Sequence, residues 1–267
     1  MFAAARNNQV NRMQGLENGG VTGVEELCLK FFTMKFKDRK VVVAGGTSGI
    51  GLATARLFLQ EGAIVTVTGR NPQRLQSASA EGLLVKAVDS GHRKALDAFF
   101  ADHGPVDHVV IATSGGKGMG EFAGLSLDLL REGFAEKFWP QLETLQAALP
   151  YLRADGSVTL ITAISASAKL PGVSGLAAIN GALELMVPIL SRELPAIRIN
   201  AVSPGLVDTP WWNFLPAEEK PAAFAQFTAG IPAKRVARPE EVADVIGFLA
   251  GNDYMRGKVI GVDGGMA

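Results

Sequence analysis

The sequence is poor in the side chains that form disulfides and metal sites: its 267 residues include one cysteine, Cys28, and three histidines. A single cysteine excludes an internal disulfide, and we expect no metal site. The formal net charge is zero, and no basic stripe that would bind nucleic acid is visible. No apolar stretch approaches the roughly 18 residues that cross a bilayer. These absences predict a cytoplasmic protein that binds neither nucleic acid nor membrane.

Hydrophobic residues make up 48% of the chain and charged residues 19%, a balance typical of a globular protein whose strands are buried on both faces. Residues 1–33 differ because they mix Asn, Gln, Gly and Arg and lack the features of a secretory signal. We interpret them as a dispensable or disordered N-terminal extension, and a docking or targeting arm is the alternative. Residues 34–267 are predicted to form one domain.

From residue 40 onward, short β-branched runs alternate with helical stretches. Such strands pair in parallel through right-handed crossovers, which predicts a single doubly wound α/β domain. The predicted strands are Val41–Val43, Ala63–Thr68, Leu83–Val88, His108–Ala112, Val158–Thr162, Arg198–Val202 and Lys258–Val262. The main helical patterns are Gly49–Gln60, Ser126–Leu152, Ser174–Leu194 and Glu240–Leu249.

The strongest chemical signal joins the first strand to the first helix and reads Val43-Ala44-Gly45-Gly46-Thr47-Ser48-Gly49-Ile50-Gly51. Strand, glycine turn and helix form the context of a dinucleotide-binding turn. Gly45 lets the chain leave the strand tightly, Gly49 lets the backbone approach a pyrophosphate, and Gly51 lets the helix pack closely on the sheet. The N–H groups at the helix start, around Ile50, and the hydroxyls of Thr47 and Ser48 would bind phosphate. A tight turn without a ligand is the alternative.

The end of the second strand favours NADP(H) over NAD. An NAD site usually has a carboxylate about 20 residues past the turn, for the adenosine ribose. No Asp or Glu lies between Gly62 and Ala80, and Arg70 follows the strand instead. A guanidinium pairs with a 2′-phosphate; a solvated surface arginine is the alternative. Asp89, after the third strand, is placed either to accept from an adenine amino group or to cap a helix.

Three motifs in the right order resemble the short-chain dehydrogenase/reductase family over roughly residues 36–267. They are Ala44–Gly51, the segment Arg198–Pro210, and the ending that runs from Arg238 through Val262-Asp263-Gly264-Gly265. The resemblance implies a seven-stranded Rossmann-type sheet and a homotetramer or homodimer built partly on the helices Ser126–Leu152 and Ser174–Leu194. It also implies that four residues lie against the nicotinamide end of the cofactor: Pro204, Gly205, Val207 and Thr209.

The family's catalytic positions hold other residues here. The family usually carries a Ser after the fifth strand, a Tyr-x-x-x-Lys on the next helix, and an Asn on the helix before. Counting along the chain from both sides places Ala163, Leu176, Asn180 and Lys137 at the positions of the Ser, Tyr, Lys and Asn. The usual Asn-Asn-Ala-Gly after the fourth strand is also altered and reads Ile111-Ala112-Thr113-Ser114, with Ala112 beside the cofactor. Neither tyrosine of the chain, Tyr151 or Tyr254, falls on the helix 174–194.

The usual Asn and Lys are therefore exchanged into Lys137 and Asn180. If these positions face each other, the exchange keeps an ammonium and an amide near the nicotinamide ribose. We hypothesise that Lys137 supplies the cation and the proton, while Asn180 binds the ribose; a solvated lysine and a packing asparagine are the alternatives. Ser165 is a further candidate donor to the substrate, in a loop whose polarity also suits plain solvation.

An aromatic cluster follows Pro210, where the family has a mobile substrate lid: Trp211, Trp212, Phe214 and Leu215. It indicates either an apolar substrate pocket covered on closure or an interface or core contact. Two functions fit the sequence. The first is an NADP(H)-dependent oxidoreductase that acts on a small, apolar, carbonyl-like substrate by a non-standard proton route. The second is an NADP(H)-binding sensor or assembly subunit without redox turnover.

Overall fold

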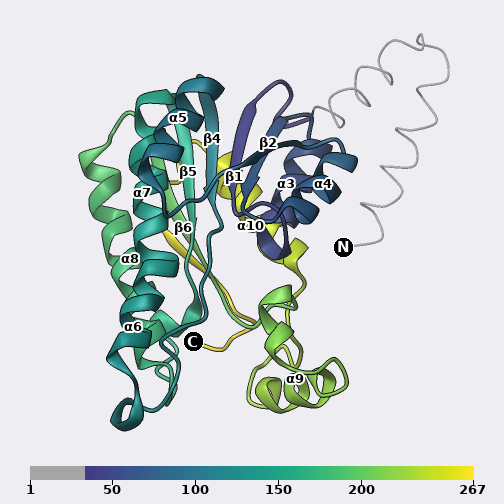
Figure 1. Cartoon of the computed structure of the whole chain (residues 1–267), viewed down its shortest axis with the longest axis vertical. Helices are drawn as coiled ribbons and strands as arrows, with labels where there is room; N and C mark the ends of the chain where they lie inside the picture. The colour runs from purple at the N-terminus through teal and green to yellow at the C-terminus, as the bar shows by residue number, and fades with distance from the viewer. Residues whose placement is uncertain (1–33) are drawn as a thin grey trace, which may run out of the picture. The chain divides into compact units, whose positions relative to one another are not determined.

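The computed structural model describes residues 34–267, so the interpretation of residues 1–33 lies outside the described residues. Residues 35–267 form one compact unit. Its centre is a seven-stranded sheet with the order β3-β2-β1-β4-β5-β6-β7, parallel at every pairing (Figure 1). The strands are β1 (Lys40–Ala44), β2 (Ile64–Gly69), β3 (Leu84–Ala87), β4 (Val106–Ile111), β5 (Leu152–Ile161), β6 (Arg198–Pro204) and β7 (Val259–Val262). The predicted doubly wound Rossmann-type fold is confirmed.

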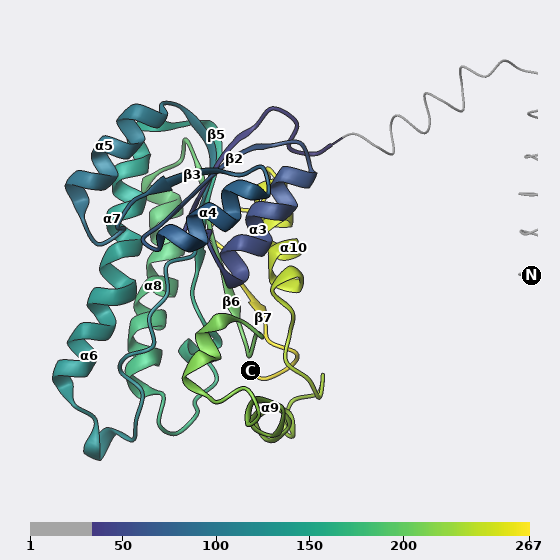
Figure 2. The same cartoon turned by 45° about the vertical axis from the view of Figure 1, so that its right-hand side comes forward.

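Helices cover both faces of the sheet, as Figures 1 and 2 show. One apolar core joins α3 (Gly49–Gln60) and α10 (Pro239–Ala250) to the sheet, and α4 (Pro72–Ala80) packs beside them on β2 and β3. The second core lies under α5 (Arg93–His103), α7 (Trp139–Ala148) and α8 (Ser174–Glu193). The remaining helices are α6 (Leu127–Gly133) and α9 (Lys220–Thr228). Buried residues such as Val41, Val42 and Val43, each fully buried, alternate between the two cores because a central parallel strand is covered on both faces.

The sheet reverses its winding between β1 and β4, since the order runs outward from β1 to β2 and β3 and then continues from β4. Ligands of open α/β sheets bind at such a switch point, outside the carboxyl ends of the strands. The glycine turn after β1 and the segments after β4, β5 and β6 all lie at this end. The fold therefore positions the site between these four chain segments.

The helix predicted for Ser126–Leu152 is interrupted, and its end was placed wrongly. A π-helical turn, Phe134–Phe138, separates α6 from α7, and β5 already begins at Leu152 after a short 3₁₀ turn. Pro140 lies in the first turn of α7. It has no N–H to donate to the fourth residue before it, and its ring crowds that residue's carbonyl group, so the regular α-helical ladder breaks there. Lys137 sits in the resulting turn.

The expectation that no segment is apolar and long enough to cross a bilayer was wrong for α8. Its 20 residues meet the criteria of length and hydropathy, although Glu184 lies within it. In this structure α8 packs on β6 and on the π-helical turn, with Leu183 and Val187 fully buried.

A buried polar cluster holds the opposite end of the sheet. Arg198, at the start of β6, is 1% exposed and donates to the carbonyl oxygens of Leu249, Ala250 and Asn252, at the end of α10. Beside it, His108 of β4 bonds through Nδ1 to Ser157 Oγ of β5 at 2.8 Å. Burial, together with the Arg198 charge, lowers the pKa of His108 to about 4. The imidazole is therefore neutral in the folded protein near pH 7.

Candidate functional site

The glycine turn is shaped by contacts that side chains would prevent. Gly45 has a φ of 78°, a left-handed conformation, and a Cβ there would lie 2.9 Å from the main chain of Ala112, just past β4. A Cβ on Gly51 would collide with the carbonyl oxygen of Gly45. Gly49, with a φ of 53°, faces the side chain of Thr209. The turn thus brings the segments after β4 and β6 against the start of α3.

The main-chain N–H groups at the start of α3 have no side-chain acceptor in the described part of the chain. Ser48 is the N-cap residue, yet its side chain makes no capping hydrogen bond, and the first turn holds no acidic residue. The N–H groups there, with the positive end of the helix dipole, favour an anion. Thr47 packs against Gly69 at the end of β2, because a Cβ on that glycine would lie 2.8 Å from the threonine methyl group. The turn and the end of β2 therefore form one surface.

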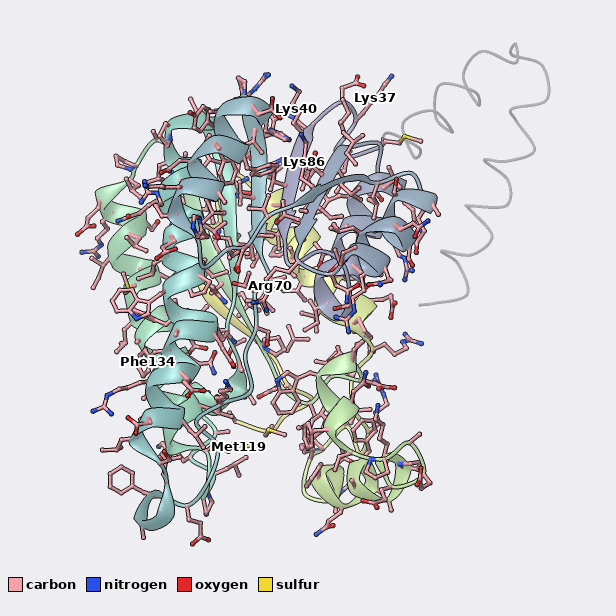
Figure 3. The ribbon with its side chains drawn as sticks, viewed as in Figure 1. Lys37, Lys40, Arg70, Lys86, Met119 and Phe134 are labelled. Carbon is pink, nitrogen blue, oxygen red and sulfur yellow. The ribbon has the colours of Figure 1, made fainter. Side chains whose placement is uncertain are left out.

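At that surface Arg70 follows β2 directly and is exposed. Figure 3 shows it at the end of the strands away from Lys37, Lys40 and Lys86. A second guanidinium, which the sequence analysis missed, comes from α4: Arg74 Nη1 donates to Ser48 Oγ at 3.3 Å. The spacing of four residues after Arg70, on a helix capped by Asn71, was a usable signal. Two cations thus border the turn.

Asp89 does not cap a helix. Helix α5 starts at Arg93 with His92 as its N-cap, and Asp89 Oδ1 accepts from the N–H of Gly91 at 3.0 Å. The helix-cap interpretation was wrong because the aspartate instead closes an Asx turn two residues long. Its carboxylate stays exposed at the end of β3.

The segment after β6 closes the other side of the site. Gly205 donates to Val262 O at 2.9 Å, and a Cβ on it would lie 2.8 Å from Asp263 Cα. Val207 is 5% exposed. Thr209 caps the 3₁₀ turn Pro210–Phe214 with its side chain. Pro204 ends β6 and is buried. These residues lie at the carboxyl edge of the sheet, with Thr209 against Gly49.

The aromatic residues after Pro210 pack on one another and on α9, and one of them, Trp211, also contacts the loop after β4. Trp212 is 8% exposed and donates to Val207 O, and its ring lies 5.4 Å and 5.7 Å from those of Phe224 and Phe227 in α9. Trp211 instead donates through Nε1 to Gly115 O at 3.3 Å, in the loop after β4. Trp212 is therefore a core contact within the segment, whereas Trp211 joins the segment to the opposite side of the site.

Lys137 is buried, with 7% of its surface exposed. Its Nζ donates to the main-chain oxygen of Thr162, just past β5, at 3.0 Å. Burial lowers the pKa of Lys137 to about 8, and the nearby Glu184 carboxylate acts in the opposite direction. The alternative of a solvated helix lysine was wrong.

Asn180 and Ser165 are brought together, on α8 and on the 3₁₀ turn Ile164–Ala166. Asn180 is 3% exposed, and its Nδ2 donates to Ser165 Oγ at 3.0 Å and to Leu176 O at 2.9 Å. Its Oδ1 is buried and has no partner among residues 34–267. A buried acceptor without a partner costs free energy, so this oxygen points to a missing donor. No hydrogen bond joins Lys137 to Asn180 within the described residues, although α8 packs on the π-helical turn.

Comparison with known proteins assigns the chain to a family. The family model described as enoyl-(acyl carrier protein) reductase matches residues 44–267. The chain belongs to the short-chain dehydrogenase/reductase family. It is 30% identical over 258 residues to the 3-oxoacyl-[acyl-carrier-protein] reductase FabG of Thermotoga maritima. The alignment covers 87% of this chain and 99% of that relative.

Solved structures of short-chain dehydrogenase/reductase proteins resemble the chain closely. A small-chain dehydrogenase in complex with NADPH is 28% identical, with a TM-score of 0.76 and coverage of 86% of this chain and 99% of that one. An NADPH-bound short-chain oxidoreductase from Pseudomonas aeruginosa PAO1, described as containing an atypical catalytic center, is 29% identical, with a TM-score of 0.76 and coverage of 86% and 98%. The protein is an oxidoreductase of this family that uses a nicotinamide cofactor.

One charged group of the site, Glu184, was not predicted from the sequence. It lies one turn after Asn180 on α8, and its Oε1 accepts from Thr162 Oγ1 and Ser203 Oγ, each at 2.7 Å. The i, i+4 spacing from Asn180 was the available signal, because it places both side chains on one face of the helix.

Proposed function

We propose that this enzyme reduces a carbonyl group with NADPH and that the Lys137 ammonium, in place of a tyrosine phenol, supplies the proton. The observation that carries the proposal is a buried lysine, Lys137, whose Nζ lies 3.0 Å from Thr162 O just past β5, beside a helix α8 that has neither tyrosine nor lysine in its sequence. Burial lowers the pKa of this lysine to about 8. A general acid works best when its pKa is close to the working pH. Reduced nicotinamide, when bound, supplies the hydride to the carbonyl carbon. Lys137 gives one proton to the carbonyl oxygen and becomes a neutral amine.

Asn180 and Ser165 would orient the reactants. The unpartnered Oδ1 of Asn180 is an acceptor for a ribose hydroxyl of the cofactor. Ser165 Oγ already accepts from Asn180, so its own proton is free to bind the substrate oxygen. The relative from Pseudomonas aeruginosa, described as having an atypical catalytic center and bound to NADPH, supports a non-standard site on this fold.

The preference for NADPH is proposed from Arg70, helped by Arg74. Two guanidinium groups beside the phosphate-binding turn suit a 2′-phosphate better than a ribose diol. Arg70→Leu is expected to weaken NADPH binding about 10- to 100-fold, since a hydrogen bond to a charged group contributes about 1.5–3 kcal/mol. NADH binding should not change. Fluorescence titration of both cofactors measures this, with Arg131→Leu in α6 as a control; an unaltered NADPH/NADH ratio would contradict the role of Arg70.

The substrate is proposed to be small and apolar at the end that contacts Trp211. The curated relatives are named for an acyl-carrier 3-oxoacyl group, 4-formylbenzenesulfonate and cis-4-hydroxycyclohexanecarboxylate. They suggest a panel of 3-oxoacyl thioesters, aromatic aldehydes and cyclic ketones. NADPH oxidation is followed by absorbance with each compound. Tight NADPH binding without oxidation of NADPH by any of them would favour the cofactor sensor over the enzyme.

We also propose that the protein is a homo-oligomer that uses the outer face of α8, and that it works in the cytoplasm. Leu185 and Ile189, one turn apart, are 74% and 56% exposed, and Trp139 of α7 is 55% exposed. Leu185→Asp is expected to convert the assembly to smaller species in size-exclusion chromatography with light scattering. Leu84→Asp, at an exposed leucine of β3, is the control and should leave the mass unchanged. An unchanged mass for Leu185→Asp would exclude this face.

A further inference from the structure

Lys137 and Glu184 belong to one polar network at the carboxyl ends of β5 and β6. Thr162 connects them, because its main-chain oxygen accepts from Lys137 Nζ at 3.0 Å while its hydroxyl donates to Glu184 Oε1 at 2.7 Å. Ser203 donates to the same carboxylate oxygen at 2.7 Å. Thr162 and Ser203 are 2% and 3% exposed. Strands β5 and β6 thus hold the carboxylate in a fixed place near the ammonium.

The network explains how a lysine is tolerated at this depth. A buried ammonium that donates to a single neutral acceptor loses most of its hydration free energy, and it tends to release its proton instead. A fixed carboxylate nearby offsets part of that loss. The hydrogen bonds that the hydroxyls of Thr162 and Ser203 donate to Glu184 stabilise its charged form and hold its carboxylate in one position.

We propose that Glu184 is a positioning residue for Lys137, and that it keeps the Lys137 ammonium charged, and so able to donate a proton, at neutral pH. The catalytic meaning of this pairing rests on the proposed function, but the pairing itself does not. The groups of β5 and β6 that bond to Lys137 or Glu184 are the uncharged Thr162 and Ser203.

Two other carboxylates close to Lys137 in the chain pair with Lys117. Glu136, next to Lys137 in the chain, forms an ion pair with Lys117 at 3.0 Å, and Lys117 also pairs with Glu132. The carboxylate that raises the pKa of Lys137 against the effect of burial is Glu184. Removal of its charge should therefore leave burial unopposed.

The test is a direct titration of the Lys137 amine in the intact protein. Lysine labelled with ¹³C at Cε reports amine ionisation in a ¹H–¹³C spectrum, and the resonance that disappears in Lys137→Met is assigned to Lys137. Its midpoint is expected near pH 8 in the native protein. Glu184→Gln should lower the midpoint by roughly one pH unit, the lower end of the shift that a neighbouring opposite charge causes. An unchanged midpoint in a folded Glu184→Gln variant overturns the proposal.

Two further variants sharpen the result. Glu193→Gln removes the same charge from the far end of α8 and should leave the midpoint in place; an equal shift would mean that any distant carboxylate suffices. Ser203→Ala keeps the carboxylate but removes one of its anchors, so a smaller fall in the midpoint is expected, and this variant decides the question if Glu184→Gln does not fold. If the protein shows no turnover, that result refutes the proposed function, while a shifted midpoint still supports the pairing of Glu184 with Lys137.

Discussion

Lys137→Met is expected to reduce kcat at least about 100-fold for whichever carbonyl substrate the enzyme turns over. A positioned general acid contributes about 10²–10⁴-fold, and methionine has a similar length but no proton to give. The loss of one member of a buried charge pair is destabilising, so we expect a less stable variant, and kcat is compared under conditions in which it is folded. NADPH oxidation at saturating substrate measures the rate, and urea unfolding measures the stability.

Lys94→Met is the control for this change. Lys94 is exposed on α5, and its replacement should change neither rate nor stability. A Lys137→Met enzyme with an unchanged kcat would exclude Lys137 as the proton donor. The hydroxyl of Ser165, which accepts a hydrogen bond from Asn180, would then be the next candidate for the proton donor.

Folding stability is expected to fall by about 3 kcal/mol as the pH drops from about 6.5 to about 4, because of His108. Its pKa is lowered to about 4 in the folded protein by burial and by Arg198, whereas the unfolded chain keeps the ordinary value near 6.5. Between these two values the unfolded state binds more protons, so acid favours unfolding. The stabilisation is complete above the unfolded value and is lost towards the folded one. Burial lowers the pKa of His103 as well, which adds in the same direction.

Urea unfolding at pH 7.5 and pH 5 measures the effect, and His108→Gln should remove about 2 kcal/mol of the difference between the two. Carboxylates contribute to acid sensitivity in both proteins, so the comparison isolates the imidazole. His92→Gln, at the exposed N-cap of α5, is the matched control. If His108→Gln retained the whole pH dependence, the imidazole would have to be charged in the folded state.

Much of the fold could be predicted from the sequence because its signals are local. Most strands contain a short run rich in β-branched residues, and the glycines at 45, 49 and 51 mark a turn that other residues would obstruct. The break at Phe134–Phe138 was missed because apolar periodicity continues across it. Its cause, Pro140, is visible in the sequence, but a proline in the first turn of a helix usually marks an ordinary helix start.

The sequence by itself determined the doubly wound order of elements and the glycine turn at the switch point, since each depends on neighbours along the chain. Only the tertiary structure decided the surroundings of Lys137. Lys137 and Glu184 are far apart in sequence, and they are connected because Thr162 at the end of β5 bonds to both. Burial and charge then set the ionisation of the lysine, and both depend on packing that no local pattern encodes.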